Sequence, residues 1–435
     1  MAQSGRTKAA WLVMLVLLPA LVTGASHLFR AAHRIGDFED IYNESLGALH
    51  THRLSLEHPD SIGLYPPSAR PLLMVQALLP LMPAAVLWFV VYAGFHLTAC
   101  YLIARYVCGL EPPHRLAGTL IAWCLSLPWI WSDLVLCNVT SILVICTVGS
   151  YVLHARGRTG LAALVLSVGI AIKLLPAAVL GYYLWRRRFG MIAATLLCTA
   201  AIGVVPGLLW FGPRNFAEGW SLWAREPMHA RSPLVIIENH TLCTFQNQSV
   251  IATLTRLFSR VNAGRPESPF QITKVELSSR AILALWLAAM AVPLAAWGLL
   301  AAKVGPATGP PLVEGFRYAL FMLMMVWFSP QVMSYYLALL SLPLGVLGIR
   351  SFQQRLAGRR DRFVNVVLVL YALLCLTVVS PWLRAHGTYQ MIVLLLGIAT
   401  VVRSLRFQKD KAGITAEGAN SDSNRECPIQ EVSNR

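Results

Sequence analysis

The chain has 435 residues, of which 56% are hydrophobic and only 13% charged, and its formal net charge is +16. A soluble domain has about one quarter of its residues charged, so this composition excludes an ordinary soluble protein and indicates a polytopic membrane protein. The positive charges are spread over short connections between apolar runs, which argues against a nucleic-acid-binding surface and favours signals of membrane orientation.

The first apolar run, at about residues 10–29, predicts the first membrane span. A helix that crosses a bilayer needs about 20 apolar residues, and Lys and Arg in the short loops face the cytoplasm. Arg6 and Lys8 precede the run and predict a cytoplasmic N-terminus. The alternative is a removed signal peptide, because small residues at 23–25 could form a cleavage site. Further spans follow, and we therefore favour an uncleaved span with an extracytoplasmic loop after it.

This first extracytoplasmic loop, at about residues 30–70, is rich in carboxylates. Carboxylates beside a bilayer are costly unless they are used, so the loop is a candidate functional site. Asp37 is the candidate general base, and Asp40, one helical turn further on, is the alternative. A solvated carboxylate, or one paired with Arg34, is the alternative role for Asp37. The loop ends in Tyr65-Pro66-Pro67, which predicts a rigid turn that shapes a cavity.

The next segments alternate between the two sides of the membrane. Residues 71–82 are short and bounded by proline, which indicates an interfacial piece. Asp133 is expected at an extracytoplasmic turn, where it and the neighbouring tryptophans could simply mark the interface. Spans are predicted at residues 84–107, 116–131 and 135–153.

A broken helical hairpin is predicted at residues 161–185. Basic clusters stand at both ends of this stretch, at 156–158 and 186–188, and a single crossing would place one of them outside the cytoplasm. Pro176, halfway along, removes a helical donor and favours a break. We therefore expect two half-helices with Lys173 at their tip, in the extracytoplasmic cavity. The alternative is one kinked span with a snorkelling Lys173.

The second half of the chain is predicted to contain a long polar extracytoplasmic segment and several spans. The polar segment covers about residues 212–278 and includes a short interfacial or re-entrant helix at 249–258 that carries Arg256. The total is ten to twelve membrane segments, and basic residues after the last span place the C-terminus in the cytoplasm. Residues 412–435 lack periodicity and are predicted to be a disordered cytoplasmic tail. The spans are expected at residues 189–211, 281–302, 316–328, 337–349, 363–381 and 388–402.

Five short motifs in the chain resemble, in their order and spacing, those of glycosyltransferase family 87, the polyprenol-phosphate-mannose-dependent enzymes of the GT-C superfamily. Two positions depart from the family pattern: Tyr335-Tyr336 replaces a pair of histidines, and Cys137 stands where a glutamine precedes Asn138. These departures predict a different sugar or an altered activity. The motifs are Asp37-Phe38 before Tyr42, Tyr65-Pro66-Pro67, Asn138 followed by Lys173-x-x-Pro176, Asn247-Gln248-Ser249 followed by Arg256, and Ser329-Pro330 followed by Tyr335-Tyr336.

The resemblance implies a fold and a reaction. The fold would be an all-α, multi-span GT-C-like bundle over residues 1–411, with broken helices and an extracytoplasmic cavity. The reaction would be the inverting transfer of a hexose, such as mannose, from a polyprenyl-phosphate donor to a lipid or glycan acceptor at the cell membrane. Asp37 would take the acceptor proton, and Lys173 and Arg256 would stabilise the departing lipid phosphate. Tyr65, Pro66, Asn138, Asn247, Gln248, Tyr335 and Tyr336 would line the substrate cavity.

No metal or separate cofactor is expected, because the lipid-linked donor is itself the co-substrate and the cysteines lack the spacing of a metal site. Asn247 and Gln248 could alternatively cap the helix that follows them.

Two other classes of function remain open. A multi-pass transporter or lipid flippase would carry its ionisable residues within crossing helices, a pattern that Lys173 fits. A non-enzymatic assembly protein would leave the acidic loop without a chemical role.

Overall fold

The computed structural model describes residues 37–54, 65–225, 227–304 and 309–423. The predicted span at 10–29 lies outside these residues. Within them the chain is helical and forms no strand, which confirms the prediction of an all-α polytopic membrane protein. Among the described residues, seven helices are long and apolar enough to cross a membrane, and four shorter apolar helices accompany them. The predicted total of ten to twelve segments also counts the run at 10–29, which is not among the described residues.

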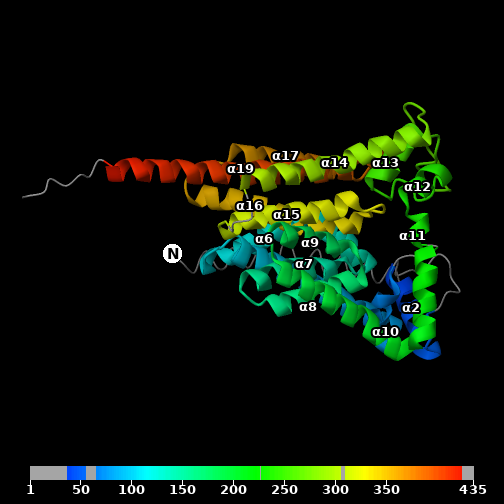
Figure 1. Ribbon diagram of the computed structural model, residues 1–435. Helices are drawn as coiled ribbons and strands as arrows, with labels where there is room; N and C mark the ends of the chain where they lie inside the picture. The colour runs from blue at the N-terminus through cyan, green and yellow to red at the C-terminus, as the bar shows by residue number, and fades with distance from the viewer. Residues whose placement is uncertain (1–36, 55–64, 226, 305–308, 424–435) are drawn as a thin grey trace, which may run out of the picture.

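The first half of the described chain begins with short helices at one end of the bundle and continues with long ones along it (Figure 1). The short elements are α2 (Asp37–Thr51), η1 (Pro67–Ala69), α4 (Arg70–Leu73) and η2 (Met74–Leu78). The long ones are α5 (Leu81–Leu102), which continues as η3 (Ile103–Val107), and α6 (Pro112–Leu136), α7 (Thr140–Ala155), α8 (Thr159–Ile172) and α10 (Phe189–Arg225). The short elements η4 (Leu175–Val179) and α9 (Leu180–Trp185) lie between α8 and α10.

The second half returns along the bundle after a group of short helices. Helices α15 and α16 with η5 are mostly buried and form the centre of the core. The elements are α11 (Pro227–Ala230), α12 (Pro233–Asn239), α13 (Val250–Phe258), α14 (Ser279–Val304), α15 (Pro311–Phe328), η5 (Ser334–Leu340), α16 (Ser341–Leu356), α17 (Arg362–Thr377), α18 (Pro381–Ala385) and α19 (Thr388–Ser423). Helix α19 continues into the segment predicted to be disordered, and residues 424–435 lie outside the described ones.

The predicted break at Lys173 is confirmed. Helix α8 ends at Ile172, and Lys173 has extended backbone angles of φ −154° and ψ 130°. The chain then returns through η4 and α9, because the ring of Tyr183 lies 5.1 Å from the ring of His154, near the end of α7. Both basic clusters therefore stand at the same end of the bundle. Lys173 stands at the other end, beside the α6–α7 turn.

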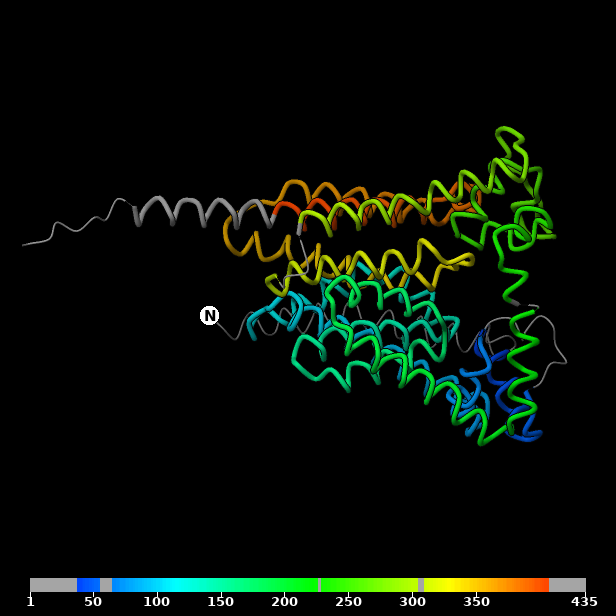
Figure 2. The backbone as a smooth tube through the Cα atoms, in the orientation of Figure 1, coloured from blue at the N-terminus to red at the C-terminus, as the bar shows by residue number. Residues whose placement is uncertain are grey.

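The first part of the predicted polar segment at 212–278 is mostly helical, through the end of α10, α11 and α12. Gly212 has φ 76° and ψ 159°, a conformation that only glycine adopts without strain, and it bends α10 in the middle. The second half of α10 then runs across the end of the bundle, next to α2 (Figure 2). Aromatic residues at helical spacing hold this half together: the ring centroids of Phe216 and Trp220 are 6.4 Å apart, and those of Trp220 and Trp223 are 5.5 Å apart.

Candidate active site

Asp37 is the first residue of α2, at the end of the bundle where Lys173 also lies. Three carboxylates in the first turn favour the start of a helix here, because they interact with its positive N-terminal end. Phe38, Ile41 and Tyr42 form the buried face of α2. An ion pair between Glu44 and the buried Arg70 anchors α2 to α4. Between Asp37 and Thr51 the predicted acidic loop is thus a helix that fixes Asp37 in place.

The Asp37 carboxylate is half-buried and hydrogen-bonded. Asn138 Nδ2 donates to Asp37 Oδ2 at 2.8 Å, and Tyr335 also hydrogen-bonds to this carboxylate. Burial raises the pKa of Asp37 above its usual value, while the Asn138 hydrogen bond and the charge of Lys173 act in the opposite direction. Asp40 is exposed, so the helical turn that separates the two carboxylates leaves only Asp37 in the interior.

Asn138 is held by the sharp turn between α6 and α7. Cys137 adopts a left-handed conformation with φ 43°, and the amide N–H of Asn138 donates to the carbonyl of Asp133 at 3.0 Å. Asn138 Oδ1 accepts from the Thr140 hydroxyl at 3.1 Å. With its oxygen held in this way, the amide directs its nitrogen at Asp37.

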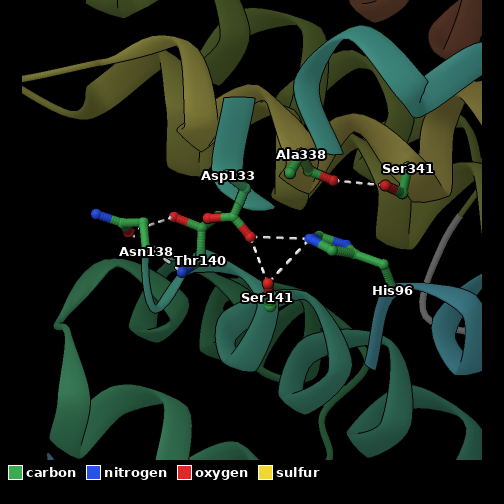
Figure 3. A network of polar contacts seen from close by, with 7 residues as sticks. All are labelled: His96, Asp133, Asn138, Thr140, Ser141, Ala338 and Ser341. Atoms are coloured by element: carbon green, nitrogen blue, oxygen red, sulfur yellow. Dashed lines mark hydrogen bonds and ion pairs between the residues drawn. The ribbon is translucent and has the colours of Figure 1, made fainter. Parts of the chain in front are cut away.

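The structure corrects the prediction for Asp133, which was expected at an extracytoplasmic turn. It is in the last turn of α6 and fully buried. Its Oδ2 lies 2.9 Å from His96 Nε2 and accepts from the Ser141 hydroxyl, so the network joins α5, α6 and α7 (Figure 3). The sequence carried a signal, because an ionisable residue inside an apolar run has to find a buried partner. That partner, His96, is 37 positions away and could not be identified from the sequence.

We expect Asp133→Ala to destabilise the protein strongly. The substitution leaves His96 and Ser141 buried without their acceptor, a loss of about 3 kcal/mol or more of unfolding free energy. Thermal unfolding of the purified protein in detergent would measure this effect. The exposed Asp40→Ala is the control and should leave the melting temperature unchanged. Equal melting temperatures for the two variants would contradict a bracing role for Asp133.

Lys173 is half-buried, and its buried Nζ makes no hydrogen bond within the described part of the chain. The ammonium lies 4.2 Å from the ring centroid of Tyr336 and 5.1 Å from that of Tyr65. These cation–π contacts stabilise the charge without using its N–H donors. Lys173 also interacts electrostatically with Asp37. The structure therefore brings the predicted base, the predicted cation and three predicted cavity tyrosines into one region.

A cavity of about 520 Å³ opens beside Lys173. Pro66 and Tyr336, both predicted, contribute to its lining, together with apolar residues and the Ser329–Gln331 turn. Arg231 also lines it and was missed by the sequence analysis. Its Nε donates to Gln331 Oε1 at 3.0 Å. Arg231 lies in a polar stretch with other basic residues, and no spacing distinguishes it from them, so only the fold of α11 and α12 brings it here.

Arg256 is not among the residues that line this cavity. It is fully buried, and its guanidinium donates to the carbonyls of Ala385, Cys243, Thr244 and Asn247 and to the Thr253 hydroxyl. Burial lowers the pKa of Arg256 to about 10, so it stays charged at neutral pH. Arg256 thus holds α13, the 243–247 loop and α18 together, and its donors point at backbone carbonyls rather than into the cavity.

We expect Arg256→Met to act on stability. The substitution removes donors from several buried carbonyls, which costs about 3 kcal/mol or more. A fall in melting temperature and in folded yield would show this effect. Arg260→Met is the matched control, because its side chain is largely exposed in its pair with Glu276. An Arg256→Met protein with normal stability and impaired activity would contradict the bracing role.

Asn247 and Gln248 lie on the same braced loop. Asn247 Oδ1 accepts from the amides of Ser249 and Val332, and its Nδ2 donates to the carbonyls of Leu242 and Pro330. The side chain of Ser249, rather than that of Asn247, caps α13. Gln248 is buried, and its amide donates to the Phe245 carbonyl. The two residues connect the loop to the Ser329–Gln331 turn, next to the cavity.

Residues 64–312 match the family model described as "Glycosyltransferase family 87". The searches of curated proteins and of solved structures gave no significant match.

Proposed function

The chain belongs to glycosyltransferase family 87, and from this premise we propose that it transfers a hexose, mannose in the first instance, from a polyprenyl-phosphate donor to a lipid or glycan acceptor. Membership of the family implies glycosyltransferase activity. One observation supports the choice of site: Asp37 and Lys173 interact electrostatically, and Lys173 also lines the cavity. A carboxylate base and a phosphate-binding cation are the two groups that this reaction needs.

Asp37 acts as the general base in this proposal. An acceptor hydroxyl loses its proton to the carboxylate as its oxygen attacks the anomeric carbon. Asn138 holds Oδ2 at 2.8 Å and so orients the carboxylate. The bond from the anomeric carbon to the phosphate oxygen breaks, and polyprenyl phosphate leaves. Direct displacement by the acceptor inverts the anomeric centre.

Lys173 and Arg231 stabilise the leaving phosphate. Its negative charge grows as the bond breaks, and fixed cations in a buried site lower the energy of that state. The Lys173 ammonium has N–H donors that no described residue uses, and Arg231 offers a planar fork suited to phosphate oxygens. Both line the cavity, which is why we propose Arg231 in place of Arg256. A lipid phosphate that leaves with its own charge requires no metal ion in this scheme.

The site would face away from the cytoplasm. The opposite end of the bundle carries Arg156, Arg158 and the Arg186–Arg188 cluster, and basic loops are retained on the cytoplasmic side. A site on the other side meets lipid-linked sugars rather than nucleotide sugars. Labelling of a cysteine introduced at exposed Asp40 with a membrane-impermeant thiol reagent tests this orientation. Labelling from the cytoplasmic side only would contradict it.

The test of the proposed function is the consumption of a donor. Purified protein in lipid nanodiscs is incubated with polyprenyl-phosphate mannose, glucose and galactose, each with a membrane extract as acceptor source, and the released polyprenyl phosphate is quantified. We expect release of polyprenyl phosphate from at least one donor, with mannose first, whereas a nucleotide sugar offered as the donor should release no nucleoside phosphate or diphosphate. Release from none of them, with folded protein, would contradict the proposal.

We expect the rate of transfer to fall at acidic pH. Asp37 must be deprotonated to accept a proton, and burial raises the pKa of its carboxyl above the usual 3.8. Activity should therefore be present at neutral pH and decline as the pH falls through this raised pKa, earlier than for an exposed aspartate. A profile of kcat/KM against pH at constant ionic strength measures the acidic limb. A rate that stays constant down to pH 4 would argue against Asp37 as the base.

A further inference from the structure

A second cavity, of about 410 Å³, lies at the end of the bundle opposite Lys173. It opens where α7 and α9 end and where α15 begins. Its lining includes three arginines, Arg156, Arg186 and Arg188, and also His154. Neither the proposed reaction nor the family motifs use these residues.

The lining of this cavity has more basic than acidic side chains. Glu314 is the acidic residue among the described residues that line it. Three residues contact that carboxylate. Arg186 lies 2.7 Å from Oε1, and Arg317 also pairs with Oε1. The Tyr182 hydroxyl donates to Oε2 at 2.9 Å. Glu314 and Arg186 are buried, whereas Arg156 and Arg188 are exposed. The cavity therefore has a buried, positively charged wall that includes Arg186, and the exposed guanidiniums of Arg156 and Arg188 lie at its rim.

Aromatic contacts hold this wall in shape. The guanidinium of Arg156 lies 5.0 Å from the ring centroid of Tyr106, and the rings of Tyr151 and Tyr182 are 6.3 Å apart. Tyr182 also packs on Tyr318, with 5.1 Å between centroids. A rim arginine that rests on an aromatic ring loses less freedom when it binds an anion. This arrangement favours a ligand with a compact negative charge and several acceptor oxygens.

We propose that this cavity binds a phosphate group, and specifically the headgroup phosphate of an anionic membrane lipid. Its position at the ends of apolar helices places it at the level of a membrane surface. Basic pockets between membrane helices on the cytoplasmic side are suited to anionic headgroups. Arg156 and Arg188 contact the phosphate oxygens from the rim, and Arg186 contributes charge from the wall. The site is separate from the transfer site, and only its cytoplasmic placement rests on the orientation given under the proposed function.

Lipid binding to the purified full-length protein tests the proposal. The protein in neutral detergent is titrated with phosphatidylglycerol, phosphatidylcholine and glycerol 3-phosphate, and bound ligand is measured by native mass spectrometry. The variant is R156Q/R188Q. The matched control is R158Q/R187Q, which removes two exposed arginines from the same two loops but none from the cavity lining. A third protein, Lys173→Met, removes the cation of the other cavity.

We expect phosphatidylglycerol to bind more tightly than phosphatidylcholine, and R156Q/R188Q to weaken that binding by about tenfold or more, because two charge-assisted contacts are lost. R158Q/R187Q and Lys173→Met should bind as the unmodified protein does. Equal binding of glycerol 3-phosphate would identify free phosphate esters as the source of the ligand, and weak binding would identify the lipid. Equal affinity for both phospholipids, or equal weakening by the two double variants, would overturn the proposal. Neither result bears on sugar transfer, which is assayed separately.

Discussion

Asp37→Asn is expected to lower the rate of sugar transfer by about 10²–10⁴-fold, the range for removal of a general base. Asparagine has nearly the same shape, and its amide oxygen can still accept the hydrogen bond from Asn138, so the folded structure and donor binding should persist. The fall should therefore appear in kcat rather than in KM. The acidic limb of the pH profile should disappear from the residual activity.

Asp40→Asn is the control for this variant. It removes a carboxylate from the same helical turn of α2, but Asp40 is exposed and the variant should transfer sugar close to the normal rate. The assay is the release of polyprenyl phosphate under single-turnover conditions, with melting temperature recorded for each protein. Normal transfer by Asp37→Asn would exclude Asp37 as the base. A loss of sugar transfer in Asp40→Asn alone would indicate that Asp40 is the general base.

Lys173→Met is expected to have the second largest effect, a loss of about 10²–10³-fold in kcat. Methionine matches the length of the lysine stem and fits among Tyr65 and Tyr336, while it removes the charge that would offset the leaving phosphate. Because a buried cation is replaced by an apolar side chain of similar volume, stability should be unchanged or higher. The variant should therefore lose activity without losing stability.

Arg214→Met is the control, because Arg214 is an exposed cation on α10 and does not line the cavity. Arg231→Gln provides a second measurement. We expect a smaller loss of kcat than for Lys173→Met, because Gln331 still shapes that side of the cavity. We also expect a higher KM for the donor. Transfer at the normal rate by Lys173→Met would remove Lys173 from the mechanism. A loss accompanied by a lower melting temperature would instead indicate a structural role.

Much of the fold could be predicted because its causes are local. The apolar length of each run predicts a span, and the distribution of arginines predicts which ends lie together. At 161–185 this rule predicted the hairpin that brings Tyr183 back to His154. The helices in the first part of the polar segment at 212–278 were not predicted, because its charged residues obscured an aromatic helical face. Phe216, Trp220 and Trp223 are three or four residues apart, a spacing that was present in the sequence but overlooked.

The candidate site could be predicted only in part, because its residues contact partners that are far away in the sequence. Asp37, Asn138, Lys173 and the tyrosine pair were identified one motif at a time, and the structure brings them together. Arg256 was chosen because an arginine follows the Asn247-Gln248-Ser249 motif, whereas Arg231 was missed because it lies in a polar stretch without a distinctive spacing. Their surroundings distinguish the two arginines. Arg256 donates to backbone carbonyls, whereas Arg231 lines an open cavity.

The sequence by itself determined the membrane class, the order of most spans and the break at Lys173. Each of these follows from chemistry within one segment: hydrophobic length, the charge of short loops, and a proline that cannot continue a helix. Only the tertiary structure decided which cation faces the cavity, why Asp133 is buried with His96, and where a second basic cavity lies. Those properties depend on contacts between helices, and a single sequence does not specify which side chains meet across them.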